Sequence, residues 1–200
     1  MALIAAVGEL LVERGAGALR IGAVADRVGV DKALIYRYFG GFEGLIAAFA
    51  ASPEFWMAAD EVIVDREHLL ALPFPERLAT LLKRYGRALR KRPATIAILA
   101  TEMLERTSVH APLEAAREKF GIEMLSLAPD APEGLDLPAV VTVLSAAVHY
   151  LLIRAQHIKT FNGVRIADDS GWERIERAIE QLALAMCSSV QLPVQGRDPA

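Results

Sequence analysis

Hydrophobic residues recur along this 200-residue chain at intervals of three and four, which is the spacing of one face of an α-helix. The pattern predicts a first helix over 3–14, with Gly15 as its stop. Two shorter helices are predicted over 22–28 and 32–39, and a fourth over about 42–51. Because no segment alternates convincingly between hydrophobic and polar residues with a period of two, we expect an all-α protein.

The second part of the chain returns to the helical pattern after a less regular stretch that begins at Pro53. Prolines mark several of the predicted helix starts, where the missing amide hydrogen costs little. Asp136 is predicted to cap the helix that follows it. The sequence Ser170-Gly-Trp-Glu173 fits a capping box at the start of the last helix. We expect these helices over about 74–92, 94–105, 113–127, 137–154 and 170–186.

Composition and charge narrow the possible functions. The net charge is −3, so contact with nucleic acid would have to come from a local basic patch. Residues 20–40 provide one, with four basic and two acidic side chains. The single cysteine, Cys187, excludes an intrachain disulfide framework and favours a reducing compartment. No cationic leader with a cleavage site opens the chain, so we expect a cytoplasmic protein.

The sequence lacks the motifs of common catalytic and cofactor sites. Its four histidines are scattered without metal-ligand spacing. Gly15 and Gly17 lack the third glycine of a dinucleotide-binding loop and do not follow a predicted strand. No Gly-x-Ser-x-Gly nucleophile motif occurs. We therefore expect no enzyme activity, no metal and no cofactor.

Residues 20–39 have the pattern of two short helices that pack against each other. The turn between the helices contains Gly29, which can adopt a positive φ, and Asp31, which can cap the second helix. In that second helix Ile35 and Phe39 share the inward face. Four residues form the buried face of the first helix: Ile21, Val24, Ala25 and Val28.

The outward face of the second helix suits the major groove of DNA. Ala33 permits close approach, Leu34 can meet a thymine methyl group, and Arg37 can pair with guanine. Lys32 and Tyr38 are placed for phosphate oxygens. Periodicity alone leaves open a helical hairpin whose cations are merely solvated. The residues predicted to contact double-stranded DNA are Arg20, Gly22, Lys32, Ala33, Leu34, Tyr36, Arg37 and Tyr38.

The segment 19–45 closely resembles the N-terminal domain of TetR/AcrR-family regulators. The resemblance is carried by Val24-Ala25, Gly29-Val30 and the run Ile35-Tyr36-Arg37-Tyr38-Phe39-Gly40. It implies a homodimer that binds a palindromic operator and represses transcription until a small molecule releases it. The expected domains are an N-terminal three-helix DNA-binding domain over 1–47, a larger α-helical ligand-binding and dimerisation domain over 48–192, and a tail over 193–200.

Three positions depart from that family's pattern. Arg20 stands where Ser or Thr usually caps the first helix of the motif, and Phe42 stands where the family often has Lys. The basic residues that commonly precede the first helix are also missing. Each departure removes a phosphate contact or a neutralising charge, so we expect modest, salt-dependent affinity. A helical protein-interaction or ligand-sensing module with weak or lost DNA binding is the alternative function.

A small-molecule site is expected among the helices between about Phe74 and Ile153. Polar side chains among apolar neighbours are candidates for ligand contacts, and methionine and phenylalanine for adaptable walls. An apolar lining indicates a hydrophobic or amphipathic effector. Ordinary packing is the alternative for each residue. The candidates are Glu102, Met103, His110, Phe120, Met124, His149 and Tyr150.

The segment 137–153 has no formal charge over 17 residues, close to the length that crosses a membrane. It contains Ser145, His149 and Tyr150, so a helix buried on both sides in a soluble protein is expected instead. One face could pack on its own domain and another, with the seam 172–186, on a second subunit; burial inside a monomer is the alternative. The predicted dimer-interface residues are Val141, Leu144, Val148, Leu152, Trp172, Ile175, Ile179, Leu182 and Met186.

Overall fold

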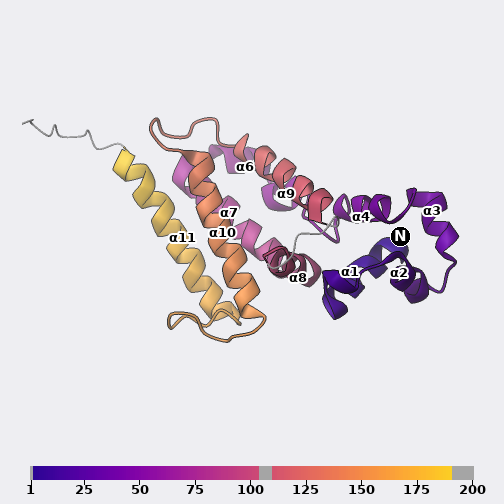
Figure 1. Cartoon of the computed structure of the whole chain (residues 1–200). Coiled ribbons are helices and arrows are strands. Elements are labelled where there is room, and N and C mark those ends of the chain that lie inside the picture. The colour runs from indigo at the N-terminus through magenta and orange to yellow at the C-terminus, as the bar shows by residue number, and fades with distance from the viewer. Residues whose placement is uncertain (1, 104–109, 191–200) are drawn as a thin grey trace, which may run out of the picture.

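The computed structural model describes residues 2–103 and 110–190, with side chains described as far as 188, and confirms the expected all-α fold (Figure 1). Within these residues the chain has no strand beyond an isolated bridge between Phe161 and Val164. The elements are α1 (Ala2–Arg14), the 3₁₀ helix η1 (Ala16–Ala18), α2 (Ile21–Val28), α3 (Lys32–Phe39), α4 (Phe42–Ala50), α5 (Ala59–Ile63), α6 (Arg66–Ala71), α7 (Phe74–Arg90), α8 (Pro93–Glu102), α9 (His110–Leu125), α10 (Leu137–Ala155) and α11 (Asp169–Val190).

Helices α1 to α4 form a lobe at one end of the molecule (Figure 1). α1 packs on α2 and α4, and α3 packs on both α2 and α4. The boundary expected at residue 47 falls inside α4, whose Phe49 still belongs to the core shared with α1. Each large side chain removed from water here stabilises the fold by about 2 kcal/mol. The centre of the lobe is formed by Val7, Leu10, Leu11, Val24, Ile35, Leu45 and Phe49.

The larger part of the chain is organised around α7, which α5, α8, α10 and α11 all contact. Its apolar residues include Leu82, Tyr85 and Leu89, all buried. α11 runs along α7 and buries Trp172 and Ile179 against this core. The lobe is joined to this part where α1 packs on α8 and where α4 packs on α9.

Some element boundaries differ from those the sequence predicts. The stretch after Pro53 contains α5 and α6, for which the pattern gave no helix. α8 begins at Pro93 and its described part ends at Glu102, while the end predicted at Glu105 lies outside the described residues. Asp136 caps α10 as predicted, since its Oδ1 accepts from the Ala139 amide at 3.1 Å.

The capping box predicted at Ser170–Glu173 is wrong, because α11 begins one residue earlier, at Asp169. Asp168 is the capping residue: its Oδ1 accepts from the Gly171 amide at 3.3 Å and from the Ser170 hydroxyl at 2.7 Å. Its backbone carbonyl accepts from the Trp172 amide. An aspartate carboxylate suits a helix N-terminus better than a hydroxyl, because it also meets the positive end of the helix dipole.

The alternative that the apolar helix α10 is buried inside a single subunit is wrong. Only 17% of its most apolar stretch is buried, and it is the one described helix that is long and apolar enough to span a membrane. Val148 and Leu152 face inward, whereas Val143 is 68% exposed and Tyr150 is 42% exposed. The subunit therefore leaves an apolar helical face uncovered.

Replacing Asp168 with Ala should lower the free energy of unfolding by about 1 kcal/mol, because the Gly171 amide loses its acceptor. The measurement is equilibrium denaturation in urea. Ser170→Ala is the matched control and should have a smaller effect, since Ser170 only donates to Asp168. A larger loss for Ser170→Ala would support the capping box predicted from the sequence.

Candidate functional site

The helix-turn-helix is formed by α2 and α3 and held by its turn. Gly29 adopts φ 74°, and the Val30 amide donates to the Ala25 carbonyl at 3.0 Å, which closes α2. Asp31 then caps α3, since its Oδ1 accepts from the Ala33 amide at 2.7 Å. Ile35 is fully buried against the lobe core. α3 is thereby fixed with one face inward and the other in solvent.

The exposed face of α3 carries the residues predicted to contact DNA. Lys32, Ala33 and Arg37 are exposed, and Leu34 is half-buried. Tyr36 is 59% exposed and Tyr38 is 68% exposed, which is an open position for a large aromatic ring. The Arg37 guanidinium lies 5.7 Å from the centre of the Tyr38 ring, so the two side chains lie together on the surface.

Arg20, Gly22 and Lys32 meet at the start of α2. Arg20 precedes the helix in an extended conformation, and its side chain makes no capping bond. A methyl group at Gly22 would stand 3.3 Å from Cε and Nζ of Lys32, so the missing side chain leaves room for that ammonium group. Arg20 and Gly22 border a hollow whose lining also includes two more arginines, Arg14 and Arg27, together with Asp26.

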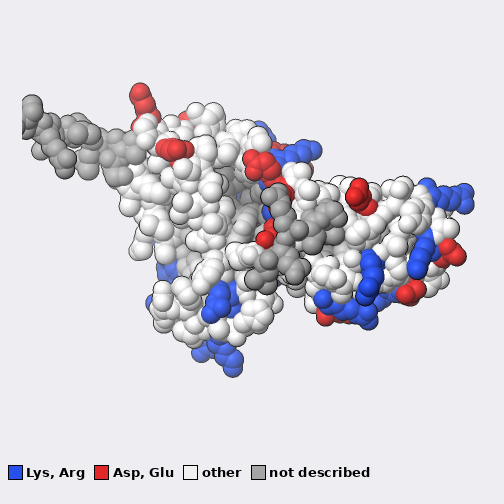
Figure 2. Space-filling model, viewed as in Figure 1, with Lys and Arg blue, Asp and Glu red and all other residues white. Residues whose placement is uncertain are grey.

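Arg27 does not contribute to this basic surface, although it is one of the four cations in 20–40. Its guanidinium bonds to Glu9 at 2.9 Å and to Glu13, both on α1. These hydrogen bonds hold the pKa of Glu13 below its usual value. The surface that remains is lined by Arg14, Arg20, Lys32 and Arg37, and basic side chains are visible along this lobe in Figure 2.

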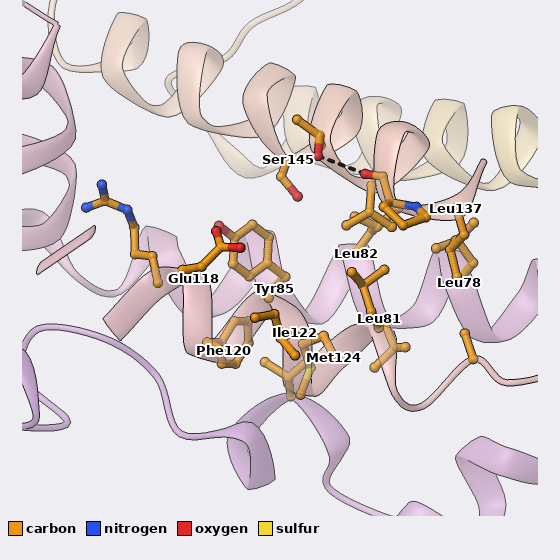
Figure 3. A pocket seen from close by; sticks show the side chains of 18 of the residues that line it. Leu78, Leu81, Leu82, Tyr85, Glu118, Phe120, Ile122, Met124, Leu137 and Ser145 are labelled. Atoms are coloured by element: carbon orange, nitrogen blue, oxygen red, sulfur yellow. Dashed lines mark hydrogen bonds between the residues drawn. The ribbon is translucent and has the colours of Figure 1, made fainter. Parts of the chain in front are cut away.

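A second candidate site is a cavity of about 570 Å³ between α7, α9 and α10. This volume is in the range of small-molecule pockets. Figure 3 shows Leu82 and Tyr85 of α7 opposite Phe120 and Met124 of α9, beneath α10. Tyr85 and Phe120 stack with ring centres 6.0 Å apart.

The cavity opens between α9 and α10. Five of its lining residues are exposed and mark this mouth: Glu118, Ile122, Pro138, Thr142 and Ala146. Because α9 and α10 are not in close contact along their length, a molecule can enter between them without separating packed helices.

One end of the cavity is polar. The Tyr85 hydroxyl is hydrogen-bonded to Nε2 of His149, and Trp56 lies against both rings. Burial lowers the pKa of His149 to about 4, with a smaller contribution from the positive charge of Arg117. Burial also raises the pKa of Tyr85, which Arg117 partly opposes. At neutral pH both groups are therefore uncharged, and Arg117 supplies the positive charge at this end.

The structure places only some of the predicted ligand-contacting residues on the cavity. Phe120, Met124 and His149 line it. Glu102 lies behind the wall and is paired with Arg117. The other three lie elsewhere: Met103 is 64% exposed, His110 is buried at the start of α9, and Tyr150 packs on Phe161.

The pattern missed Trp56, Tyr85, Arg77 and Arg117, all of which line the cavity. A signal for the two arginines was present. Each stands on the apolar stripe of its helix, Arg117 four residues after Leu113 and Arg77 four residues before Leu81. A charged residue on a buried face needs partners, and such partners commonly belong to a site. Trp56 and Tyr85 carry no comparable spacing signal.

Most of the residues predicted to form a dimer interface are occupied within the subunit. Val148, Leu152, Trp172 and Ile179 are buried in its own core, so they are not available to a partner. Val141 lines the cavity. Leu144, Ile175 and Met186 are half-buried, and Leu182 is 48% exposed. The seam 172–186 therefore packs α11 on α7 through Trp172 and Ile179 and leaves Leu182 exposed.

A different face of α10 and α11 is free. On α10 it includes Val143, Ala147 and Tyr150, and on α11 it includes Ala178 and Leu182, each spaced three or four residues apart. In Figure 2 the surface over these helices has few charged side chains. Exposed apolar residues of this kind on two helices are typical of a protein interface.

Comparisons with known proteins show similarity to bacterial regulatory proteins, both in the N-terminal sequence and in the fold. The family model described as "Bacterial regulatory proteins, tetR family" matches residues 3–49. No curated protein sequence matches the chain. Solved structures match over almost its whole length.

The fatty acid degradation regulator FadR from Bacillus halodurans superposes with a TM-score of 0.64 at 15% identity, covering 92% of this chain and 96% of its own. A putative TetR-family regulator from Rhodococcus gives 0.65 at 18% identity, covering 91% and 96%. A putative fatty acid metabolism regulator from Clostridium perfringens gives 0.61 at 14% identity, covering 90% and 97%. At these identities the likeness establishes the fold.

The buried imidazole should make the stability of the protein depend on pH. The unfolded His149 binds a proton near pH 6.5, whereas the folded side chain does so only near pH 4. Between these values the unfolded state binds more protons, so stability falls as the pH drops through this window, by up to about 3 kcal/mol.

His149→Gln keeps an acceptor for Tyr85 and should lose less stability between pH 6.5 and 4 than the wild type. Urea denaturation at a series of pH values measures the difference. If both proteins lose stability equally over this range, the imidazole is not held neutral by burial.

Proposed function

We propose that this chain, which belongs to the TetR family of bacterial regulatory proteins, represses transcription as a homodimer bound to a palindromic operator. We further propose that a small hydrophobic or amphipathic molecule in the cavity releases it from DNA. That the chain is a DNA-binding transcriptional regulator follows from its family and fold. The observation that carries the fuller proposal is the exposed basic face of α3 in one lobe, joined through packed helices to a largely apolar cavity in the other.

The roles on DNA follow from the positions of the side chains. Arg37 projects from the middle of the exposed face of α3 and is assigned to a base edge, because a guanidinium pairs with guanine through two hydrogen bonds. Lys32 and Arg20 are assigned to phosphates, since they lie at helix starts beside the hollow near Gly22. Tyr36 and Tyr38 are assigned to the same DNA backbone, to which their hydroxyl groups can donate.

Dimerisation is assigned to the free faces of α10 and α11. A four-helix arrangement of these two helices with their copies would cover Val143, Ala147 and Leu182, which otherwise stay in water. A twofold dimer also gives the two copies of α3 the symmetry that a palindromic operator requires. This interface uses the two helices predicted from the sequence and keeps Leu182, but it lies on a different face, because Val148, Leu152, Trp172 and Ile179 are buried within the subunit.

Release of DNA requires that the cavity and α3 be mechanically linked. α9 forms one wall of the cavity and packs on α4, and α4 packs on α3. A ligand that binds only one position of α9 would therefore bias the position of α3. Two of the structural neighbours are described as regulators of fatty acid degradation or metabolism, which agrees with an effector that carries an acyl-like apolar chain.

Arg37→Ala and Lys32→Ala should weaken DNA binding in different ways. The arginine variant should lose about 10- to 100-fold affinity for the operator and discriminate less well at one base pair of each half-site. The lysine variant should weaken binding to all sequences and lower the salt dependence by about one unit of slope.

Fluorescence anisotropy with DNA from upstream of its own gene, at several salt concentrations, measures both effects. Lys119→Ala, on the exposed side of α9, is the control and should bind as the wild type does. Absence of any sequence-specific complex at low salt would favour the alternative of an interaction module without DNA binding.

Val143→Glu should convert the dimer to a monomer of 21.7 kDa, because dimerisation would bury the added carboxylate without a partner. The subunit should fold normally, since Val143 is 68% exposed in it. Sedimentation equilibrium at micromolar concentration gives the mass. Val12→Glu, at an exposed position on α1, should remain a dimer; a wild type that sediments only as a monomer removes the dimer from the proposal.

A further inference from the structure

The polar end of the cavity is built from hydrogen-bond donors around one buried cation. Arg117 lines the cavity with its side chain only 17% exposed, and its guanidinium lies 5.9 Å from the centre of the Trp56 ring. The Trp56 side chain is 6% exposed, and its Nε1–H is buried without a hydrogen-bond partner. A buried donor left unpaired costs about 1–3 kcal/mol, so this end of the cavity favours a ligand that brings an acceptor.

A carboxylate already occupies Arg117 from outside the cavity. Glu102 receives two parallel hydrogen bonds from the guanidinium, at 2.8 Å and 2.7 Å, and its side chain is 14% exposed. Glu102 is not among the residues that line the cavity, whereas Arg117, which it binds, is. The fork of an arginine matches any carboxylate in this way, and a ligand acid can therefore compete for the same two donors.

The position of Glu102 makes that competition feasible. Glu102 is the last residue of α8, where the negative end of the helix dipole disfavours a carboxylate. Exchange for a ligand carboxylate keeps Arg117 paired and lets Glu102 reach water. The buried charge is thus compensated in both states, which removes the main cost of breaking a buried ion pair.

The rest of the cavity suits an unbranched apolar chain. From Tyr85 its wall continues along α7 through Leu82 and Leu81 to Leu78, a distance of about 10 Å at the helical rise. Met124 and Leu125 of α9 and Leu137 of α10 line the same length. Two acidic residues also line the cavity, but Glu118 is exposed at the mouth and Glu114 already has an interaction of its own.

We propose that the effector is an apolar monocarboxylic acid whose carboxylate displaces Glu102 from Arg117 and whose chain lies along α7. The proposal rests on the function given above and adds the chemical class of the effector and the contact that it breaks. Displacement frees the C-terminal end of α8, the helix whose Ala94 lies against Gly8 of α1 in the DNA-binding lobe. The ion pair between α8 and α9 is then the part of the subunit that senses the ligand.

Titration calorimetry near neutral pH with octanoic acid, 1-octanol and octylamine tests the class of ligand, because the three share one chain and differ in the head group. The wild type should bind the acid about tenfold or more tightly than the alcohol, as expected for a hydrogen bond to a charged group, and should not bind the amine more tightly than the alcohol. Equal binding of acid and alcohol, or preference for the amine, overturns the proposal.

Two variants test the competition. Glu102→Gln should bind the acid several-fold more tightly and leave the affinity for the alcohol unchanged, because it weakens the internal competitor. Arg117→Met should bind acid and alcohol about equally. Glu176→Gln is the matched control: Glu176 accepts a similar pair of bonds from Arg87 on the far side of α7, so its loss should alter neither affinity.

Thermal melts of each variant verify folding, and Glu102→Gln alone remains decisive if Arg117→Met does not fold. An unchanged affinity of Glu102→Gln for the acid overturns the displacement. If the alcohol binds the wild type as well as the acid does, this inference fails while the apolar effector site stands. If none of the three compounds binds, the effector site in the proposed function fails too.

Discussion

The packing of α7 is the constraint on which the rest of the subunit depends. α7 is 17 residues long and carries buried apolar side chains on more than one face, so no single neighbouring helix could cover them. α11 covers one side, where Trp172 and Ile179 enter the core and Arg87 binds Glu176 at the edge. On the other side Leu78, Leu82 and Tyr85 are buried by helices that do not close on them completely. The cavity is the space that this incomplete closure leaves.

The polar groups of the cavity are held by the same helices that define it. Tyr85 comes from α7, His149 from α10 and Arg117 from α9, and Trp56 from the segment before α5 lies against all three. Such a cluster is stable only when its groups are neutral or paired, because buried charge is costly. His149 is neutral at pH 7, and Arg117 is paired with Glu102. A second acceptor in the cavity would therefore compete with Glu102 for Arg117, whose charge is already paired.

In the DNA-binding lobe, by contrast with the incompletely covered α7, a small packed core holds α3 with one face exposed. Val24 and Ile35 are completely buried, and Asp31 and Gly29 fix the turn between their helices. Because Arg27 is hydrogen-bonded to Glu9 of α1, one of the four cations in residues 20–40 does not contribute to the basic surface. The lobe contacts the cavity wall where α4 packs on α9. It also contacts α8, on which α1 packs. Both connections consist of packed side chains, which transmit displacement because they have little free space.

The sequence by itself determined the helical fold, the bounds of α3, the cap of α10 and the outward face of the helix-turn-helix. These features are local: three- and four-residue spacing, a glycine able to take positive φ and an aspartate at a helix start act within a few residues. The placement of Phe120, Met124 and His149 on one cavity was also within reach, because each lies on an apolar helix in the right region. Arg117 and Arg77 could have been found as charges on buried stripes.

Only the tertiary structure decided which apolar face meets which neighbour. The seam that includes Trp172 and Ile179 has the spacing of an interhelical contact, but spacing does not say whether the partner is α7 or a second subunit. For the same reason the spacing did not identify the free face of α10. It also did not identify the ion pair of Glu102 with Arg117, which lies 15 residues away in sequence on another helix. Periodicity identifies a face that must be covered, and the covering surface depends on contacts between segments far apart in the chain.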